Sequence, residues 1–270
     1  MDQDTVTAII PARTRADLAV LDERTVPLAG ASWVFSESNL DLEAYVDLTT
    51  MGWPPLTVSG AGLEIAATCT LEELAAFPAP AGWAAHPLLR QCCTALYGSY
   101  KIWRVATVGG NIATSLAAGP MISLAAALDG VALVWRPDGT DHRVPVAQLV
   151  LGNNISALAV GEVLRAVELP LATLQSRTAY RKIALSPLGR SGAVVIGRLD
   201  ADGGFVLTIT AATVRPVQLR WPVRPGAGEL AEAVSAVEEW FTDPHGAADW
   251  RRAVSGVLAE EIRLELGGTS

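Results

Sequence analysis

The chain has 270 residues and is 50% hydrophobic, so it can build a sizeable core in one large domain or two small ones. Its formal charge is -8 and its basic residues are scattered singly, which argues against a nucleic-acid partner. The acidic start at Met1 and the lack of any apolar run of about 18 residues predict neither a secretory signal nor a membrane span, so we expect a cytoplasmic protein.

The first 52 residues are predicted to begin with a strand and a helix. Residues 5–10 have the pattern of a short strand, and Thr14 with Asp17 has the spacing of a capping box, which predicts a helix start. An apolar run at residues 26–28 then leads into small residues, where the backbone can turn sharply. This turn is the first candidate ligand loop, and it comprises Ala29, Gly30, Ala31 and Ser32.

Strands and helices are mixed between residues 46 and 172. A strand at 46–48 precedes a hairpin of strands 56–58 and 63–66, and Thr70 with Glu73 repeats the capping-box pattern before a helix. A longer helix is predicted over residues 87–97, because proline favours a first helical turn and Gly98 favours a helix end. Beyond it we expect a helix at 120–128, a hairpin of strands 131–136 and 142–144, and a strand at 163–169.

From about residue 173 the pattern predicts a smaller α+β domain. Three strands are expected at residues 180–183, 193–199 and 205–212, and two helices at 229–241 and 243–266. In the second helix Asp243 can cap the N-terminus. An apolar residue recurs there every four positions, which favours one buried face, formed by Trp250, Val254, Leu258 and Ile262.

Protein-ligated metal is not predicted. The spacing of Cys69, Cys92 and Cys93 fits neither a C-x-x-C pair nor the four-thiolate runs that hold iron–sulfur clusters, and the three histidines form no metal-binding pattern. Any iron–sulfur cluster is therefore expected on another chain. Cys92 and Cys93 lie in a predicted helix among apolar neighbours, so we expect both to be buried and inert.

The segment with the most chemical information comprises Thr107, Val108, Gly109, Gly110 and Asn111. Adjacent glycines in a loop let the backbone approach a pyrophosphate, and successive N–H groups can form a nest for its charge. Taken alone, Gly-Gly-Asn is more often ordinary turn chemistry. The earlier loop of small residues favours a phosphate-binding role over an ordinary turn, because two loops can clamp one diphosphate. The G-x-G-x-x-G turn of a Rossmann nucleotide site is absent.

Four motifs, taken in order, resemble those of the FAD-binding subunits of molybdopterin dehydrogenases. This group includes the medium subunit of carbon monoxide dehydrogenase and the flavin domain of xanthine dehydrogenase. Its members carry A-G-G-x-x, then V-D-L, then G-L-x-I-G-A-x-T-x-L-x-E-L and finally A-T-V-G-G-N-I. The matching segments of this chain are residues 29–31, 46–48, 62–74 and 106–112, and weaker matches continue to a Trp250-Arg251-Arg252 segment near the C-terminus.

The resemblance implies an α+β (mixed α/β) protein with a two-lobed FAD-binding domain of the vanillyl-alcohol-oxidase/PCMH type. That domain would span residues 1–172, with lobes at about 1–52 and 53–172. A C-terminal flavoprotein domain with a three-stranded antiparallel sheet and helices would span residues 173–270. An extended FAD would lie between the lobes, with the C-terminal domain closing near the flavin ring.

By the same resemblance, residues 29–32 would approach the FAD diphosphate from the first lobe and residues 107–111 from the second. Leu151 would lie near an apolar part of the cofactor, and Lys182 near the flavin edge. Trp33 and Thr114 complete the predicted cofactor-binding set. Trp33 and Trp103 are the tryptophans adjacent to the two loops, and they are the candidates for contact with the flavin ring. Tyr97 and Tyr100 either help to cover the cofactor or simply end a helix.

Three departures from the family pattern bear on affinity. Ala31 replaces the second glycine of the first loop, which is tolerable if its φ is negative. Ser32 and Trp33 stand where a polar Asp or His is frequent. The family's D-P-x-S-D run reads Leu-Ala-Ala-Gly-Pro at residues 116–120, so an acid that commonly binds the cofactor is absent. We predict FAD binding that is weaker or differently arranged, but not lost.

The expected function is electron transfer in a molybdenum hydroxylase or dehydrogenase. Electrons would come from a molybdenum cofactor on a large subunit through [2Fe-2S] clusters on a small subunit to this FAD. They would then pass to NAD, a quinone or oxygen. Two alternatives stay open: a stand-alone FAD oxidoreductase with its own proton donor, and a flavin-free structural or assembly subunit that kept the fold.

Overall fold

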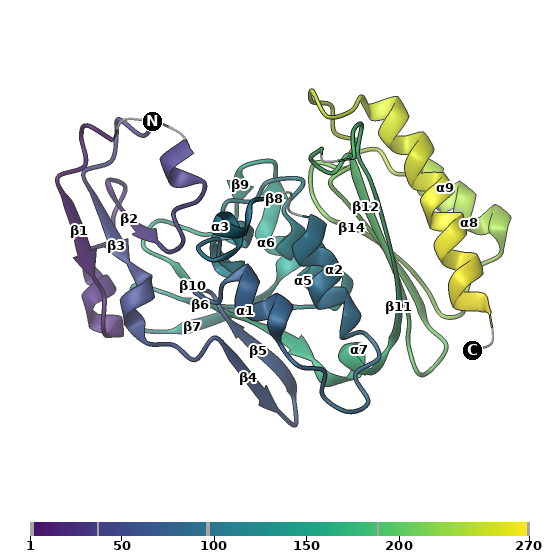
Figure 1. Ribbon diagram of the computed structural model, residues 1–270, viewed down its shortest axis with the longest axis horizontal. Coiled ribbons are helices and arrows are strands. Elements are labelled where there is room, and N and C mark those ends of the chain that lie inside the picture. Colours follow the sequence, from purple (N-terminus) through teal and green to yellow (C-terminus); the bar gives the residue numbers. More distant parts are fainter. Residues whose placement is uncertain (1–2, 37, 96–97, 188, 269–270) are drawn as a thin grey trace.

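The computed structural model describes residues 3–36, 38–95, 98–187 and 189–268. Three sheets follow one another along the long axis of the molecule in the order in which they occur in the chain (Figure 1). The N-terminal lobe and the C-terminal helices therefore lie at opposite ends. Helices accompany the second and third sheets, and the predicted mixed α/β class is confirmed.

The N-terminal lobe is built on a parallel sheet with strand order β1-β3-β2. Its elements are β1 (Ala8–Pro11), η1 (Arg15–Val20), β2 (Thr25–Leu28), η2 (Val34–Ser36), β3 (Ala44–Asp47) and η3 (Leu48–Met51), where η marks a 3-10 helix. The predicted capping box of Thr14 and Asp17 is present, although the helix that it starts is a 3-10 helix. Strand β2 runs directly into the first candidate loop.

The middle of the protein contains an antiparallel sheet with strand order β4-β5-β10-β6-β7. Its strands are β4 (Leu56–Ser59), β5 (Gly62–Ala66), β6 (Val131–Trp135), β7 (Asp141–Pro145) and β10 (Val163–Pro170), with a small hairpin of β8 (Val150–Gly152) and β9 (Ile155–Ser156) beside it. Both predicted hairpins and the capping box at Thr70 are confirmed.

Seven helices of the described residues belong to this middle region. They are α1 (Leu71–Ala76), α2 (Pro87–Ala95), α3 (Tyr100–Trp103), α4 (Val108–Ala113), α5 (Pro120–Ala127), α6 (Val146–Leu149) and α7 (Leu171–Gln175). All residues of α5 are buried, which makes it the central helix of the largest hydrophobic core. Tyr97, at the predicted end of α2, lies outside the described residues.

The first two lobes meet at a pair of tryptophans. The rings of Trp53 and Trp135 pack edge to face, with centroids 5.4 Å apart. The guanidinium of Arg165 lies over the Trp53 ring at 4.4 Å, and Arg15 from the first lobe lies over the Trp135 ring at 4.8 Å. These aromatic and cation–π contacts join the N-terminal lobe to the middle region.

The C-terminal region has a four-stranded antiparallel sheet, with order β11-β12-β13-β14, rather than the predicted three-stranded one. The strands are β11 (Arg177–Ile183), β12 (Ala193–Leu199), β13 (Phe205–Thr210) and β14 (Val217–Trp221). Strand β14 escaped prediction because Pro216 and Pro222 mark its two ends as loop. Proline is tolerated at the ends of an edge strand, and β14 is an edge strand.

The two faces of this C-terminal sheet serve different cores, since side chains alternate along a strand. Val194 and Ile196 pack into the central core, whereas Ala193 and Val195 pack on the side of the C-terminal helices. Those helices are α8 (Ala227–Ser235) and α9 (Ala248–Gly267), and they lie on the outer side of the sheet (Figure 1).

Both C-terminal helices are shorter than predicted. Helix α9 begins at residue 248 and not at 243, because the Asp243 carboxylate is bound by the buried guanidinium of Arg251 and accepts a hydrogen bond from the His245 N–H. Asp243 thus organises a turn ahead of the helix and does not cap it. Helix α8 ends at Ser235, several residues before the predicted end.

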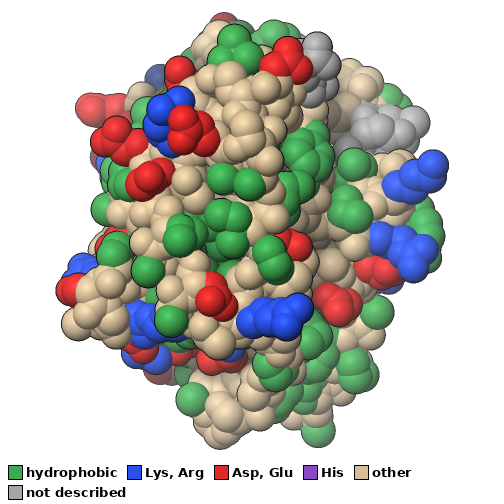
Figure 2. Space-filling model, turned by 90° about the vertical axis from the view of Figure 1, so that its left-hand side faces the viewer, with side chains coloured by type: hydrophobic (Ala, Val, Ile, Leu, Met, Phe, Trp, Pro, Cys, Tyr) green, Lys and Arg blue, Asp and Glu red, His purple; other side chains and the backbone are tan. Residues whose placement is uncertain are grey.

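The outer face of the N-terminal lobe carries interspersed charges. Figure 2 shows acidic and basic side chains scattered over this face among hydrophobic and neutral ones. Two of the lobe's arginines are in ion pairs, Arg24 with Glu43 and Arg15 with Asp141. Among the described helices, none is long and apolar enough to cross a membrane.

Candidate functional site

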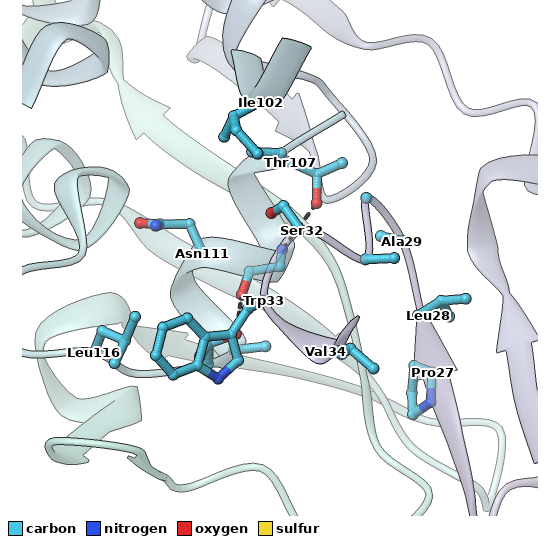
Figure 3. Close-up of a pocket in the computed structure, with 16 residues that line it drawn as sticks. Pro27, Leu28, Ala29, Ser32, Trp33, Val34, Ile102, Thr107, Asn111 and Leu116 are labelled. Atoms are coloured by element: carbon cyan, nitrogen blue, oxygen red, sulfur yellow. Dashed lines mark hydrogen bonds between the residues drawn. The ribbon is translucent and has the colours of Figure 1, made fainter. Parts of the chain in front are cut away.

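The two candidate loops line one cavity between the N-terminal lobe and the middle region. The cavity has a volume of about 350 Å³ and lies between the end of β2 and helices α3 and α4 (Figure 3). Its lining residues are Pro27, Leu28, Ala29, Gly30, Ala31, Ser32, Trp33, Val34, Ile102, Ala106, Thr107, Gly110, Asn111, Ala113, Thr114 and Leu116. The sequence placed the two loops 79 residues apart, and the tertiary structure brings them face to face.

The first loop touches the opposite wall through Gly30. A Cβ atom at this position would lie only 1.6 Å from the carbonyl oxygen of Val105, so no side chain fits there. Ala31 follows with φ of 55°, in the left-handed region. The condition under which alanine would be tolerated here, a negative φ, is therefore not met: the turn needs the conformation that glycine adopts without strain, and alanine adopts it at a cost of about 1 kcal/mol.

The turn presents backbone donors that have no internal acceptor. The N–H groups of residues 30–33 make no hydrogen bond to any group within the described part of the chain. The Ser32 hydroxyl likewise donates to no described residue, whereas the Ser32 carbonyl oxygen accepts from the Ser36 hydroxyl at 3.3 Å. Successive N–H groups in a turn that includes a left-handed residue form an anion-binding nest.

The second segment is a helix and not the loop expected from the sequence. Thr107 is the N-cap of α4, and its hydroxyl oxygen accepts a hydrogen bond from the Gly110 N–H at 3.1 Å. Val108 N–H donates to the Cys69 carbonyl at 2.8 Å, and Gly109 N–H donates to the Ala67 carbonyl at 2.9 Å. The Asn111 N–H donates to the Thr107 carbonyl at 3.0 Å, so the N–H groups of residues 108–111 are all used internally and do not form the predicted nest.

The glycines of α4 serve close packing. A Cβ at Gly109 would lie 2.3 Å from the Ala67 Cβ, so Gly109 lets α4 approach the end of β5. A Cβ at Gly110 would meet only the Thr107 hydroxyl oxygen, at 2.9 Å, and Gly110 lines the cavity. Gly110 therefore adds no side chain to the cavity that it lines, whereas Gly109 serves the packing of α4.

Two polar side chains of this second wall keep donors available. The Asn111 Oδ1 atom accepts from the Met121 N–H at 2.9 Å, which fixes the amide, while the Asn111 Nδ2 group donates to no described residue. The Thr107 hydroxyl accepts from Gly110, so its own hydrogen is free to point elsewhere. Thr114 also lines the cavity, but its hydroxyl donates to the Gly110 carbonyl at 2.7 Å.

A second, smaller chamber of about 90 Å³ lies next to the first. The two chambers share four lining residues, namely Pro27, Ala29, Gly110 and Ala113. The remaining lining of the second chamber is mostly apolar and comprises Leu48, Ala67, Gly109, Leu158, Glu162, Val163 and Leu164. Two apolar chambers separated by small shared lining residues suit a ligand with a ring system on each side of a diphosphate.

The electrostatics of the cleft depend on dipoles and not on cations. No lysine or arginine lines either chamber, as far as the described residues go. The one charged lining residue, Glu162, is paired with Arg136 at 3.2 Å and accepts a hydrogen bond from the Ala159 N–H. Leu116 lines the cavity where the related family carries an acid. The donors at residues 30–33, with Thr107 and Asn111, fit the diphosphate of a dinucleotide.

Three residues expected near a cofactor do not line either chamber. Leu151, in β8, is 52% exposed. Lys182, in β11, belongs to the C-terminal sheet, and burial lowers the pKa of its amine. Val108 is buried in the central core, and the partly buried Trp103 packs against that core. Tyr100 is exposed at 67%, and Tyr97 is not among the described residues.

Several lining residues were not found from the sequence. Pro27, Leu28, Val34, Ile102 and Ala113 are apolar and belong to none of the motif segments named from the sequence. Only their position beside the motif residues could have suggested them. Cys92 and Cys93, by contrast, are buried as expected, and burial raises the pKa of the Cys93 thiol to about 12. Cys69 is buried as well.

A family model described as "FAD binding domain in molybdopterin dehydrogenase" matches residues 5–172, more than half of the chain. No curated protein matches the sequence. Among solved structures, a chain of reconstituted CO dehydrogenase from Oligotropha carboxidovorans is 20% identical, with a TM-score of 0.82 over 98% of this chain and 99% of that chain. A chain of quinoline 2-oxidoreductase from Pseudomonas putida 86 is 18% identical, with a TM-score of 0.82 over 98% of each chain.

A further similar structure is carbon monoxide dehydrogenase from Hydrogenophaga pseudoflava, in a form that lacks the Mo-pyranopterin moiety of its molybdenum cofactor. Its matching chain is 18% identical, with a TM-score of 0.81 over 97% of each chain. At these identities the structural matches establish the fold over nearly the whole chain, including the C-terminal region that the family model leaves out.

Proposed function

Since this chain belongs to the family of FAD binding domains in molybdopterin dehydrogenase, we propose that it binds FAD between its two N-terminal lobes and transfers electrons within a molybdenum-containing hydroxylase or dehydrogenase. The observation that carries the proposal is the convergence of both motif segments on one cleft, with unused backbone donors at residues 30–33. The proposed binding domain is residues 1–172, with lobes at about 1–52 and 53–172, and residues 173–270 form the C-terminal domain.

In this proposal the residues of the first loop hold the diphosphate. The N–H groups of residues 30–33 donate to its oxygens, and Gly30 lets the backbone come close enough because it carries no side chain. Thr107 and Asn111 add side-chain donors from the opposite wall. The two apolar chambers take the ring systems, which removes them from water.

Bound flavin supplies one- and two-electron chemistry, so the protein needs to position the ring and adjust its potential. No nucleophile or acid–base pair is required of this chain. Lys182 is the proposed residue near the flavin edge. It lies two residues after Tyr180, which packs into the central core, so it shares the sheet face that is turned toward α2. Leu151 is proposed as an apolar contact at the rim.

The proposed partners are a large subunit with the molybdenum cofactor and a small subunit with [2Fe-2S] clusters. The matched carbon monoxide dehydrogenase from Hydrogenophaga pseudoflava, described as lacking the Mo-pyranopterin moiety of its molybdenum cofactor, supports a partner that holds such a cofactor. The thiols of Cys69, Cys92 and Cys93 are buried, and burial raises the pKa of each, which makes them poor candidates for cluster ligands. NAD, a quinone or oxygen is the proposed acceptor.

The test is uptake of FAD by the purified chain, followed by absorbance between the near ultraviolet and the blue and by isothermal titration. We expect one FAD per chain, and we expect co-purification with two other subunits when the neighbouring genes are expressed together. A chain that takes up no FAD, or a catalytically complete monomer, contradicts the proposal. Asn111→Asp keeps an acceptor for the Met121 N–H but replaces the donating amide by a carboxylate, so it should weaken FAD binding.

One observation favours a second candidate, a structural or assembly subunit that has lost the flavin. The strained alanine at residue 31 and the leucine at residue 116 both replace residues that favour cofactor binding in the resembling family. The same absorbance measurement separates the two functions, because a structural subunit would assemble with its partners while remaining colourless on its own.

A further inference from the structure

Trp33 is the one exposed residue among the eight tryptophans, and it stands at the cleft. Its side chain is 36% exposed and lines the larger chamber. Figure 3 shows the indole extending from the first loop toward Leu116 on the opposite wall. Within the described residues its ring makes no stacking or cation–π contact, and its indole N–H donates no hydrogen bond.

Other tryptophans have structural partners. Trp53 and Trp135 pack against each other, Trp221 packs against Phe205, and the Trp240 indole N–H donates to the Val237 carbonyl at 2.6 Å. An indole that stays partly exposed to water contributes little to the stability of the folded protein, because the stabilisation comes from removing apolar surface from water. Packing of the kind seen for the other tryptophans does not account for Trp33.

The indole is held beside the unused donors of the first loop. The Trp33 N–H is itself one of them, and the Trp33 carbonyl accepts from the Ser36 N–H at 2.8 Å, which anchors the residue in a defined turn. The Ala31 carbonyl accepts from the Phe35 N–H at 3.3 Å and secures the other side of the turn. An apolar plane next to an anion nest suits a phosphate that is linked to a flat ring.

We propose that Trp33 is a stacking wall of the cleft, against which one ring system of the bound dinucleotide lies. The turn then supplies affinity for the diphosphate and the indole supplies affinity for the ring. This inference rests on the proposed function, because it places a side chain of this protein against FAD. It deepens that function by naming a residue that separates ring-bearing nucleotides from bare diphosphate.

The test compares Trp33→Ala and Trp33→Phe in the full chain, with Trp240→Phe as the control that removes an indole from the C-terminal core. FAD, FMN, ADP and inorganic pyrophosphate are titrated into each protein. We expect Trp33→Ala to weaken FAD binding roughly tenfold, the effect of losing one stacked ring, and to leave pyrophosphate binding unchanged. Trp33→Phe should lie between wild type and Trp33→Ala, and Trp240→Phe should match the wild type.

The smaller nucleotides identify the ring. If the flavin ring stacks on the indole, FMN binding weakens, ADP binding does not, and the emission of bound flavin rises in Trp33→Ala because a quenching partner is lost. If adenine stacks there, ADP binding weakens and flavin emission stays constant. Either result supports the stacking wall and assigns the larger chamber.

Two results would contradict the proposal that Trp33 is a stacking wall, and they can be distinguished from each other. If wild-type protein binds FAD and Trp33→Ala binds all four ligands with the same affinity and emission, the stacking wall is overturned while the proposed function stands. If wild-type protein binds no FAD, both proposals fall. Circular dichroism of each variant confirms that the comparison is made on folded protein.

Discussion

Gly30 lies directly against the backbone of Val105, so that the first loop and the wall of the second lobe are in contact at one point of the cleft. A Cβ at Gly30 would fall 1.6 Å from the Val105 carbonyl oxygen and 2.6 Å from its carbonyl carbon. This contact therefore sets how closely the loop approaches the segment that leads into α4.

Replacing Gly30 by alanine should push the loop away from Val105. We expect Gly30→Ala to lower the free energy of unfolding by about 1–3 kcal/mol, the usual cost of forcing an extra group into a packed site, and to reduce FAD affinity at least as strongly. Urea denaturation and FAD titration measure the two effects. Gly60→Ala is the matched control, because nothing lies within 4 Å of a Cβ at Gly60. Equal behaviour of the two variants would contradict the prediction.

Replacing Ala31 by glycine should relieve strain in the same loop. Ala31 has φ of 55°, where glycine has no steric penalty, so Ala31→Gly is expected to raise the free energy of unfolding by about 0.5–1 kcal/mol despite the greater freedom of glycine in the unfolded chain. FAD affinity should be kept or increased. Thermal melts measure the change in stability. Ala29→Gly, at a residue without positive φ, should instead lower the melting temperature.

Asp129 links the end of α5 to the C-terminal sheet and should make stability depend on acid. Burial raises the pKa of this carboxyl, but hydrogen bonds from Arg220 and Arg198 outweigh burial and hold the pKa below its ordinary value of 3.8. A carboxyl whose pKa is lowered by folding contributes stability above its unfolded pKa and loses it as the pH falls through the folded value.

Asp129→Asn should therefore destabilise the protein at pH 7 by about 1–3 kcal/mol, because two arginines lose a charged partner. Asparagine tolerates the positive φ of 51° at this position, so the backbone is not disturbed. Urea denaturation at several pH values should show the difference from wild type shrinking below about pH 4, where Asp129 protonates in the unfolded and then in the folded state. A difference that is constant down to pH 2 would argue against the ion pairs.

The three cysteines should be unreactive in the native protein. Cys69, Cys92 and Cys93 are buried, and burial raises the pKa of Cys93 to about 12 and that of Cys92 well above its ordinary range. Thiol titration at pH 8 is expected to detect almost no free thiol before guanidinium is added and three thiols afterwards. Rapid labelling of folded protein would show that α2 opens readily.

Local sequence signals were sufficient wherever a few neighbouring residues determine the structure. The capping boxes at Thr14 and Thr70 and the hairpin of β6 and β7 depend on side chains within one or two turns of chain, and all three occur. Local sequence signals gave a wrong prediction where a contact with a distant residue decides the structure. Asp243 looks like a helix cap, yet Arg251 binds its carboxylate and shifts the start of α9.

The candidate site divides in the same way. The two segments of small residues, 29–32 and 107–111, could be found from the sequence, because motifs and their spacing are properties of the chain. The motif order also identified the FAD-binding family, which the family model confirms. The sequence could not show which of the two segments keeps backbone N–H groups without an acceptor; this depends on the folded structure. Backbone N–H groups at residues 108–110 are used by Ala67, Cys69 and Thr107, whereas those at residues 30–33 have no acceptor in the described chain. Hydrogen bonds between distant segments cannot be assigned from local pattern, since they depend on which surfaces meet after folding.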